Sequence, residues 1–395
     1  MSGVWMRRVV LALAFACTHI VVLAIHLPVR EFAGDGFFDH WDFYGNVDNT
    51  TWGNVTYVDE PTARAQQLIY TNGQGNVVMR VDNFTTLTPA QLVLRNSLRL
   101  TTKDRFQIGS LIIIDVVHMP YGCSVWPAFW TLGSPQDWPV GGEIDLIEGV
   151  NNMGFNQIAI HTTEGCYQTQ IAEQTGVLLE GDCSNDRGCI TRETKPNSFG
   201  AAFAQAGGGV WALQIAESGI YAWFWSRPDI PENIRNATPQ TPIDTIPWGF
   251  PTAAYPNTRC NINQFFSPQH LVLLTTLCGA WAGEPSVYAS TCQTPTNSCF
   301  ADNILGNGAN YLNAFWEIRY IRIYLSEDAP PPPPPTSATP TPTPTQTPPA
   351  TTTDPRQLPP PSTSSGSAVG LQWDNSWANM KFSGILGLLG TIFML

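Results

Sequence analysis

Three carboxylates stand close together in the otherwise apolar stretch "WPVGGEIDLIEGVNN". They are Glu143, Asp145 and Glu148, spaced two and then three residues apart. The apolar neighbours and flanking glycines predict a β-strand, in which residues i and i+2 share one face. Glu148 would then point to the opposite face, unless Leu146 or Ile147 is the extra residue of a β-bulge that turns it back. A helix is the alternative, although it would give no amphipathic stripe.

Carboxylates gathered on one face of a strand could hydrolyse a glycosidic bond, with one acting as nucleophile and another as acid/base. We assign Glu143 as nucleophile, Glu148 as acid/base and Asp145 as the group that perturbs both pKa values, because like charges in contact cannot all ionise. The alternative is a calcium site or a solvated acidic face. Calcium sites usually take their ligands from loops, so we predict no metal at these acids. We also predict no cofactor.

Tryptophans near the acids could form a sugar-binding cleft, since aromatic faces pack against the apolar faces of sugar rings. The candidates are Trp126, Trp130, Trp138 and Trp281, although a single Trp is more often a core residue. Trp138 is the strongest candidate, because the Pro and Gly residues around it predict a loop at the mouth of a site. His161, expected on the next strand, could be either a structural or an active-site histidine.

Composition narrows the class of partner. The chain has 395 residues, 14 Trp, and 19 Lys and Arg against 31 acids, for a net charge of −12. This charge argues against nucleic acid or an anionic membrane surface as the partner. A neutral polymer is a better candidate for the substrate of a chain with this charge.

The chain divides into four parts. The sequence of residues 1–24 is typical of a signal peptide, and an uncut signal anchor is the alternative. Residues 25–328 contain short alternating runs rich in Val, Ile, Tyr, Phe and Trp, which predict an all-β sandwich or barrel. Residues 329–367 form a stalk rich in Pro, Thr and Ser. Residues 368–395 match a GPI-attachment signal, with a simple hydrophobic tail or a short membrane span as the alternative.

Eight cysteines follow the predicted signal peptide, and an even number in a secreted chain predicts disulfides. Cys183 with Cys189, and Cys292 with Cys299, are plausible local pairs, but the sequence leaves the connectivity open. Sequons at Asn49, Asn54, Asn83 and Asn236 fit the same extracellular location, at a cell surface or wall if the anchor is present.

Nearly all of the chain from about residue 27 to 326 resembles glycoside hydrolase family 16, in its basidiomycete laminarinase type. The block "GGEIDLIEG" resembles the bulged E-x-D-x-x-E active-site motif of that family. Further blocks agree in the same order, namely "RNSLRL", "HMPYGCSVWPAFW", "IHTTEGC", "FPTAAYPNTRCNINQFF", "CGAWAGEPSVY" and "AFWEIRYIRIY".

The resemblance implies a β-jelly-roll sandwich of two antiparallel sheets with a concave cleft. It implies retaining endo-hydrolysis of β-1,3-glucan and mixed-linkage β-1,3-1,4-glucan, with Glu143 as nucleophile, Asp145 as assisting acid and Glu148 as acid/base. It also implies that the sugar cleft is lined by Trp130, Trp138, His161, Trp281, Arg95 and Asn96.

Two other functions compete with a hydrolase. A wall transglycosylase would use the same nucleophile, and a glucan-binding lectin could use the same sandwich without either catalytic acid. In each case the expected partner is a β-glucan polysaccharide or oligosaccharide, and the protein is expected to act as a monomer. Contact with a membrane is expected only through a GPI anchor.

Overall fold

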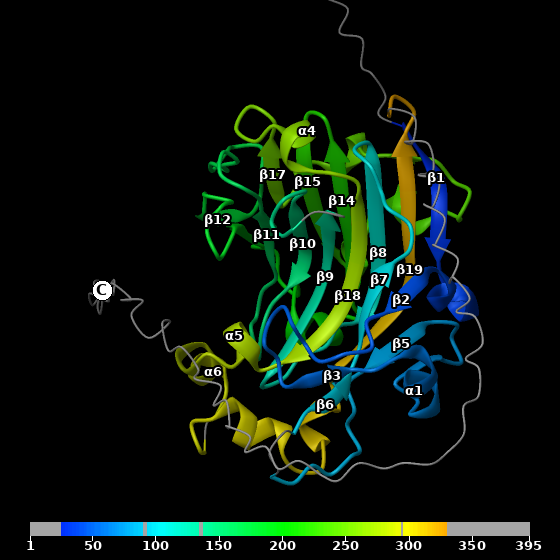
Figure 1. Ribbon diagram of the computed structural model, residues 1–395. Coiled ribbons are helices and arrows are strands. Elements are labelled where there is room, and N and C mark those ends of the chain that lie inside the picture. The colour runs from blue at the N-terminus through cyan, green and yellow to red at the C-terminus, as the bar shows by residue number, and fades with distance from the viewer. Residues whose placement is uncertain (1–24, 90–92, 134–136, 294, 330–395) are drawn as a thin grey trace, which may run out of the picture. The chain divides into compact units, whose positions relative to one another are not determined.

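The computed structural model describes residues 25–89, 93–133, 137–293 and 295–329 (Figure 1). The predicted signal peptide, all but the first residue of the predicted stalk, and the predicted tail lie outside these residues. Within them, every helix is too short or too polar to cross a membrane.

Two large antiparallel sheets make up most of the described chain (Figure 1). The first has the order β16 (Ile243–Asp244), β1 (Ile25–Phe32), β19 (Phe315–Ser326), β8 (Ser110–His118), β14 (Gly209–Ala216), β15 (Gly219–Ser226) and β17 (Ala253–Pro256), with β5 (Val77–Arg80) and β4 (Ile69–Thr71) attached beside β19. The second has the order β12 (Val177–Glu180), β13 (Cys189–Arg192), β11 (Gln157–His161), β10 (Glu143–Glu148), β9 (Val125–Gly133), β18 (Gln269–Leu277), β7 (Arg99–Thr102) and β2 (Trp41–Phe43).

The remaining elements are short. A small parallel sheet pairs β3 (Val55–Tyr57) with β6 (Arg95–Ser97). The α-helices are α1 (Glu60–Ala65), α2 (Gly200–Gln205), α3 (Glu232–Arg235), α4 (Ile262–Phe265), α5 (Gly279–Ala282) and α6 (Pro285–Thr291). Short helices of other types are η1 (Gly34–His40), η2 (Arg227–Asp229), η3 (Ile246–Trp248), η4 (Phe300–Ile304) and η5 (Ala309–Tyr311). The predicted all-β sandwich is therefore confirmed.

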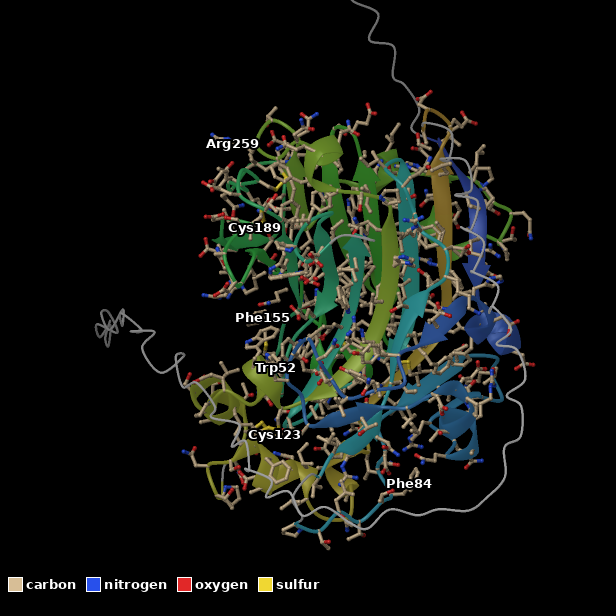
Figure 2. All side chains as sticks on the ribbon, viewed as in Figure 1. Trp52, Phe84, Cys123, Phe155, Cys189 and Arg259 are labelled. Atoms are coloured by element: carbon tan, nitrogen blue, oxygen red, sulfur yellow. A yellow bond between two sulfur atoms is a disulfide. The ribbon has the colours of Figure 1, made fainter. Side chains whose placement is uncertain are left out.

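Most disulfides of the described chain join one connecting segment to another. The pairs are Cys123–Cys292, Cys166–Cys260, Cys183–Cys189 and Cys278–Cys299. The predicted local pair of Cys183 with Cys189 is confirmed. The predicted pair of Cys292 with Cys299 is wrong, because the fold brings each of them beside a distant partner, 169 residues away for Cys292. Cys123 and Cys189 mark two separate disulfide regions of the domain (Figure 2).

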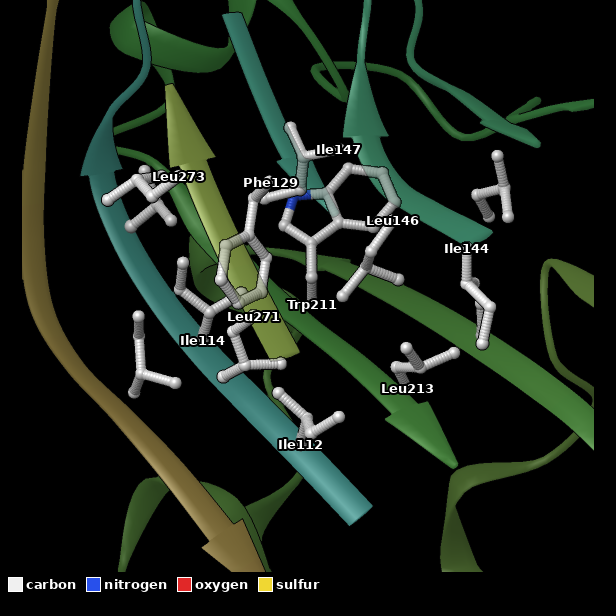
Figure 3. Close-up of a cluster of buried hydrophobic side chains, with 14 of the residues drawn as sticks. Ile112, Ile114, Phe129, Ile144, Leu146, Ile147, Trp211, Leu213, Leu271 and Leu273 are labelled. Carbon is white, nitrogen blue, oxygen red and sulfur yellow. The ribbon is translucent and has the colours of Figure 1, made fainter. Parts of the chain in front are cut away.

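The main hydrophobic core lies between the two sheets (Figure 3). Strands β8 and β14 contribute Ile112, Ile114, Trp211 and Leu213, while β9, β10 and β18 contribute Phe129, Ile144, Leu146, Ile147, Leu271 and Leu273. The alternate residues of β8 and β14 belong to a second apolar cluster on the outer face of their sheet, under the segment that contains η2, α3 and η3. Burial on both faces explains why these strands read as nearly continuous apolar runs.

Strand β10 contains the predicted β-bulge. Asp145 pairs with Trp130 of β9 and Ile147 pairs with Phe129, so Leu146 is the extra residue on that side. Leu146 and Ile147 are consecutive yet both belong to the core between the sheets, whereas in a regular strand they would point to opposite faces. The bulge therefore returns Glu148 to the face that carries the other two acids.

Asn156 satisfies the backbone groups that this bulge leaves unpaired. Its Oδ1 accepts a hydrogen bond from the Glu148 N–H at 2.9 Å, and its Nδ2 donates to the Leu146 carbonyl at 3.0 Å. The side chain is fully buried, where an unpaired polar group would cost free energy. Asn156 thus fixes the backbone on which Glu148 depends.

We expect Asn156→Ala to lower the free energy of unfolding by roughly 1–3 kcal/mol, since two buried backbone groups lose their partners. It should also lower kcat per folded molecule, because Glu148 is no longer held. Denaturant unfolding and active-site-normalised turnover measure the two effects. Asn76→Ala, which removes a buried amide bonded to Glu317 in the other sheet, is the control. An equal loss of kcat in both variants would contradict the specific role of Asn156.

Candidate active site

The outward face of the second sheet carries a cleft of about 540 Å³. Its floor is the apolar face of β9, where Ala128, Trp130 and Leu132 alternate with core residues. All three predicted acids line this cleft, together with Trp126, Trp138 and His161. The structure therefore brings most of the predicted site residues together.

Glu143 enters the cleft directly after a glycine turn. Gly141 and Gly142 have φ values of 90° and 76°, a conformation that favours glycine, and a Cβ on Gly142 would lie 2.4 Å from the Phe266 ring. Trp138, at the other end of this turn, donates its indole N–H to Glu143 Oε2 at 2.9 Å. The Trp138 side chain is about half exposed (53%), so its ring also presents a free surface at the mouth of the cleft.

Glu148 is held by two donors from neighbouring strands. The Trp126 indole N–H donates to Oε1 at 2.9 Å, and Gln157 Nε2 donates to Oε2 at 3.5 Å. Trp281 packs edge-on against the Trp126 ring, with centroids 5.4 Å apart. Trp281 thus supports the wall behind Glu148 through Trp126.

Asp145 lies between the two glutamates on the same face and is buried. Its Oδ2 is 3.5 Å from His161 Nε2, which is also 3.9 Å from Glu143 Oε1. Burial lowers the pKa of His161 to about 4, so the ring is neutral at neutral pH and neither contact is then an ion pair. His161 also packs against Trp138, with ring centroids 5.6 Å apart.

Burial raises the pKa of all three carboxyls. The pKa of Glu143 rises to about 8, through burial and then the charge of Glu148, and burial raises the pKa of Glu148 to about 7. Burial and the charges of both glutamates raise the pKa of Asp145 well above its ordinary value. Because each charge opposes the others, the three groups share protons as one set near neutral pH.

Neighbours of both glutamates oppose the effect of burial. The Trp138 N–H and the Arg99 guanidinium lower the pKa of Glu143, and the Trp126 N–H and the Gln157 amide lower the pKa of Glu148. When one glutamate is protonated, its repulsion of the other disappears. The site can therefore hold one carboxylate beside one protonated carboxyl near neutral pH.

Arg99 is a cleft residue that the sequence analysis missed. Its guanidinium carbon lies 5.0 Å from the Tyr44 ring centre and 5.7 Å from that of Trp130, which places a fixed cation between two aromatic rings. Asn49, Thr50, Thr51 and Asp186 line other parts of the cleft wall. The only sequence signal for Arg99 is its place in "RNSLRL", four residues after Arg95.

Arg95 and Asn96 do not line the cleft, so this prediction is wrong. Arg95 is fully buried, lies over the Tyr311 ring, and donates to the carbonyls of Asp82, Thr85, Ile304 and Gly306. Asn96 donates to the Gln66 side chain at 2.9 Å. Both belong to β6 of the small parallel sheet, where Arg95 holds two loops together and has no access to a substrate.

Three cleft residues could also approach a cation. Ligand atoms of Glu143, Asp145 and His161 lie within 4.8 Å of one another. The set uses carboxylate oxygens of two of the three predicted catalytic acids. A bound divalent ion would therefore compete with the chemistry of the carboxyls.

A sandwich with a glutamate pair on one face of a bulged strand, inside a tryptophan-lined cleft, is the arrangement of a carbohydrate-cleaving enzyme. The model of the XgeA-like catalytic domains of glycoside hydrolase family 16 matches residues 41–324. The chain therefore belongs to glycoside hydrolase family 16.

Curated relatives agree with this family. An endo-1,3(4)-β-glucanase of Emericella nidulans is 35% identical over 338 residues, which cover 82% of this chain and 52% of that protein. A probable glycosidase of Schizosaccharomyces pombe is 38% identical over 304 residues, which cover 75% of this chain and 68% of that protein. The chain thus spans about half to two thirds of the length of these relatives.

Two solved structures are also similar. Laminarinase 16A of Phanerochaete chrysosporium, solved with β-glucans in its donor and acceptor sites, is 34% identical with a TM-score of 0.71, covering 76% of this chain and 100% of that one. An elongating family 16 β-1,3-glucosyltransferase is 34% identical with a TM-score of 0.69, covering 76% of this chain and 99% of that one.

We expect Trp138→Phe to shift the acid limb of the pH–rate profile to higher pH. The Trp138 N–H lowers the pKa of Glu143, so its loss raises that pKa and delays formation of the carboxylate. Measured across pH, kcat/KM should fall most at the acid end of the profile. An unshifted acid limb would show that this hydrogen bond does not set the ionisation of Glu143.

We expect the carboxyl cluster to destabilise the fold as pH rises. The pKa of Glu143 is about 8 in the folded protein against an ordinary value of 4.5, so the folded state binds more protons between these values. The free energy of unfolding therefore falls with pH across this window. Glu143→Gln cannot ionise and should exceed the parent in Tm by a margin that widens from about pH 5 to about pH 8.

Thermal unfolding at several pH values measures this margin. Glu217→Gln in the β14–β15 turn, where the side chain is exposed, is the matched control and should follow the parent. A constant margin for Glu143→Gln at all pH values would contradict the shifted pKa.

Proposed function

We propose that this protein hydrolyses β-1,3-glucan and mixed-linkage β-1,3-1,4-glucan within the chain and with retention of anomeric configuration. The observation that carries the proposal is the bulge of β10, which places Glu143 and Glu148 in one cleft with a tryptophan N–H on each. Family membership and the names of the relatives, which include endo-1,3(4)-β-glucanase and laminarinase, support the substrate class.

The first chemical step uses Glu143 as a carboxylate and Glu148 as an acid. A Glu143 carboxylate oxygen attacks the anomeric carbon, and the bond from that carbon to the leaving glycosidic oxygen breaks. Glu148 gives its proton to the leaving oxygen, so the departing sugar leaves as a neutral alcohol. The product is a glycosyl ester on Glu143.

The second step reverses the proton transfer. Glu148, now a carboxylate, takes a proton from water as the water oxygen attacks the anomeric carbon, and the ester bond to Glu143 breaks. Asp145 stays beside Glu143 throughout. Its buried carboxyl can carry a proton toward Glu143 and so limit the negative charge when the ester bond breaks.

A second function, transfer to a sugar, is favoured by one relative. The similar solved enzyme that is described as an elongating β-1,3-glucosyltransferase shares 34% identity with this chain. In a transferase of this kind a sugar hydroxyl takes the place of water in the second step, while Glu143 and Glu148 keep their roles. A lectin is disfavoured, because binding alone needs no pair of carboxyls with raised pKa values.

We also propose that the domain acts outside the cell, as a secreted or GPI-anchored glycoprotein. Disulfides such as Cys123–Cys292 support an oxidising location. The apolar N-terminal segment, the Pro-rich stalk, the C-terminal tail and the sequons support the same proposal. A glucan of a wall or of the surroundings would then be the accessible substrate.

We expect Glu143→Gln to lower kcat on laminarin and barley β-glucan by several orders of magnitude, because the amide cannot form the glycosyl ester. Reducing-sugar release by residues 25–328, against cellulose as a comparison polymer, measures this. NMR of the first product should show the β-anomer before mutarotation. Release of the α-anomer would overturn retention, and no release from any glucan by the parent would overturn the hydrolase.

A further inference from the structure

A second cavity, of about 500 Å³, adjoins the catalytic cleft and belongs to none of the roles assigned above. Ala280 lines both cavities. The loop whose residues Thr50 and Thr51 border the cleft continues into Trp52 and Asn54, which line the second cavity. We call this cavity the Trp52 pocket; its volume lies within the range of small-molecule sites.

Trp52 presents an aromatic surface that folding does not require. Its side chain is 74% exposed, and its φ of 58° is rare for a bulky residue. Residues held in such conformations cluster at functional sites, where the surrounding structure enforces them. Figure 2 shows Trp52 near the segment that carries α5.

The Asp48 carboxylate enforces this conformation. It is buried and accepts hydrogen bonds from the N–H groups of Thr50, Thr51 and Gly53 at 3.0, 3.1 and 3.0 Å. It also accepts from the Thr276 hydroxyl of β18 at 2.8 Å. The loop is therefore fixed to the same strand that contributes to the cleft, and Trp52 is presented without further ordering.

The opposite wall is joined to this loop at short range. The Ala280 N–H donates to the Thr51 carbonyl at 2.9 Å, and a Cβ on Gly279 would lie 2.5 Å from that carbonyl oxygen. The disulfide between Cys278 and Cys299, which both line the pocket, ties this wall to the segment before η4. The pocket is thus rigid on both sides.

The chemistry of the lining fits one kind of ligand. Trp52 offers a flat apolar face, while Asn297 and Ser298 offer neutral hydrogen-bonding groups. No acidic or basic side chain is among the lining residues in the described chain. An aromatic face with neutral polar groups around it is suited to a sugar ring, and it offers little to a charged ligand.

We propose that the Trp52 pocket binds a glucosyl unit of the same glucan that the catalytic cleft cleaves, a proposal that rests on the proposed function. The unit reaches the pocket past Ala280, on the side of the cleft where Trp281 and Trp126 support Glu148. It belongs either to the main chain beyond the cleft or to a side branch, and both present the same pyranose ring to Trp52.

We expect Trp52→Ala to raise KM for glucan polymers by roughly three- to tenfold, because one aromatic contact with the sugar is lost. The value of kcat should change little. Laminaritriose has fewer rings than a polymer to place in the two cavities, so it should show the smallest rise. Trp52→Phe keeps a ring and should restore most of the affinity. Phe250→Ala removes an exposed aromatic that lines neither cavity, and it should match the parent.

The choice of polymer distinguishes the source of the sugar. A rise in KM for both linear and 6-O-branched β-1,3-glucan assigns the pocket to the main chain, and a rise for the branched polymer alone assigns it to the branch. An unchanged KM for both polymers overturns the proposal. An equal rise for laminaritriose also overturns it, since the effect then arises inside the catalytic cleft.

Binding measured without turnover separates this proposal from the proposed function. Glu143→Gln allows binding to be measured without turnover, by the retardation of the protein in glucan-containing gels. Adding Trp52→Ala to this variant should reduce the retardation. A parent without turnover whose binding depends on Trp52 would overturn the proposed hydrolase but support the Trp52 pocket. An active parent whose binding does not depend on Trp52 would overturn only the proposal for the Trp52 pocket. Peptide mapping that finds a glycan on Asn54 would show that the pocket is filled and would overturn the proposal.

Discussion

The insertion of Leu146 into β10 is the constraint on which the site depends. A regular strand would place Glu148 in the core between the sheets, where the burial of a charge is costly. The bulge instead sends Leu146 and Ile147 into that core in succession, against Phe129 and Trp211 (Figure 3). Core packing thus fixes the register of the acids, because a shift by one residue would exchange apolar and acidic faces.

A strand that gathers three acids on one face creates an electrostatic cost, and the surrounding residues limit it. The cleft floor is apolar, so the charged forms are disfavoured and the pKa values rise. Tryptophan N–H groups reach the two glutamates, and each of these donors comes from a residue whose ring also lines the cleft. The same aromatic side chains can therefore tune the acids and contact the substrate.

Local periodicity predicted much of this structure. The apolar runs correspond to β5, β8, β11, β14, β15, β18 and β19, and the two-then-three spacing of the acids required the bulge that the fold contains. Asn156 escaped prediction because its role appears only when the backbone of the bulge is visible. No property of "GFNQIAIH" distinguishes it from an ordinary strand-start asparagine.

Long-range pairing set the limit of that prediction. Arg95 and Arg99 lie in one short segment, yet β6 pairs with β3 while β7 pairs with β18 and β2, which sends the two side chains to different surroundings. The partners of Cys292 and Cys299 depend likewise on how distant loops meet. Such choices follow from the long-range topology of the sandwich, and neighbouring residues do not encode them.

The fate of the glycosyl-enzyme depends on what occupies the cleft beside Glu148. Water and a sugar hydroxyl compete for the same proton acceptor, so a sugar that stays bound there favours transfer. The wall near Glu148 is built from Trp126, Trp281 and Ala280, and Ala280 is also where the Trp52 pocket begins. A glucan chain held by Trp52 would leave this side more slowly than a short product. The loop that presents Trp52 is therefore positioned to influence the balance between hydrolysis and transfer without touching either glutamate.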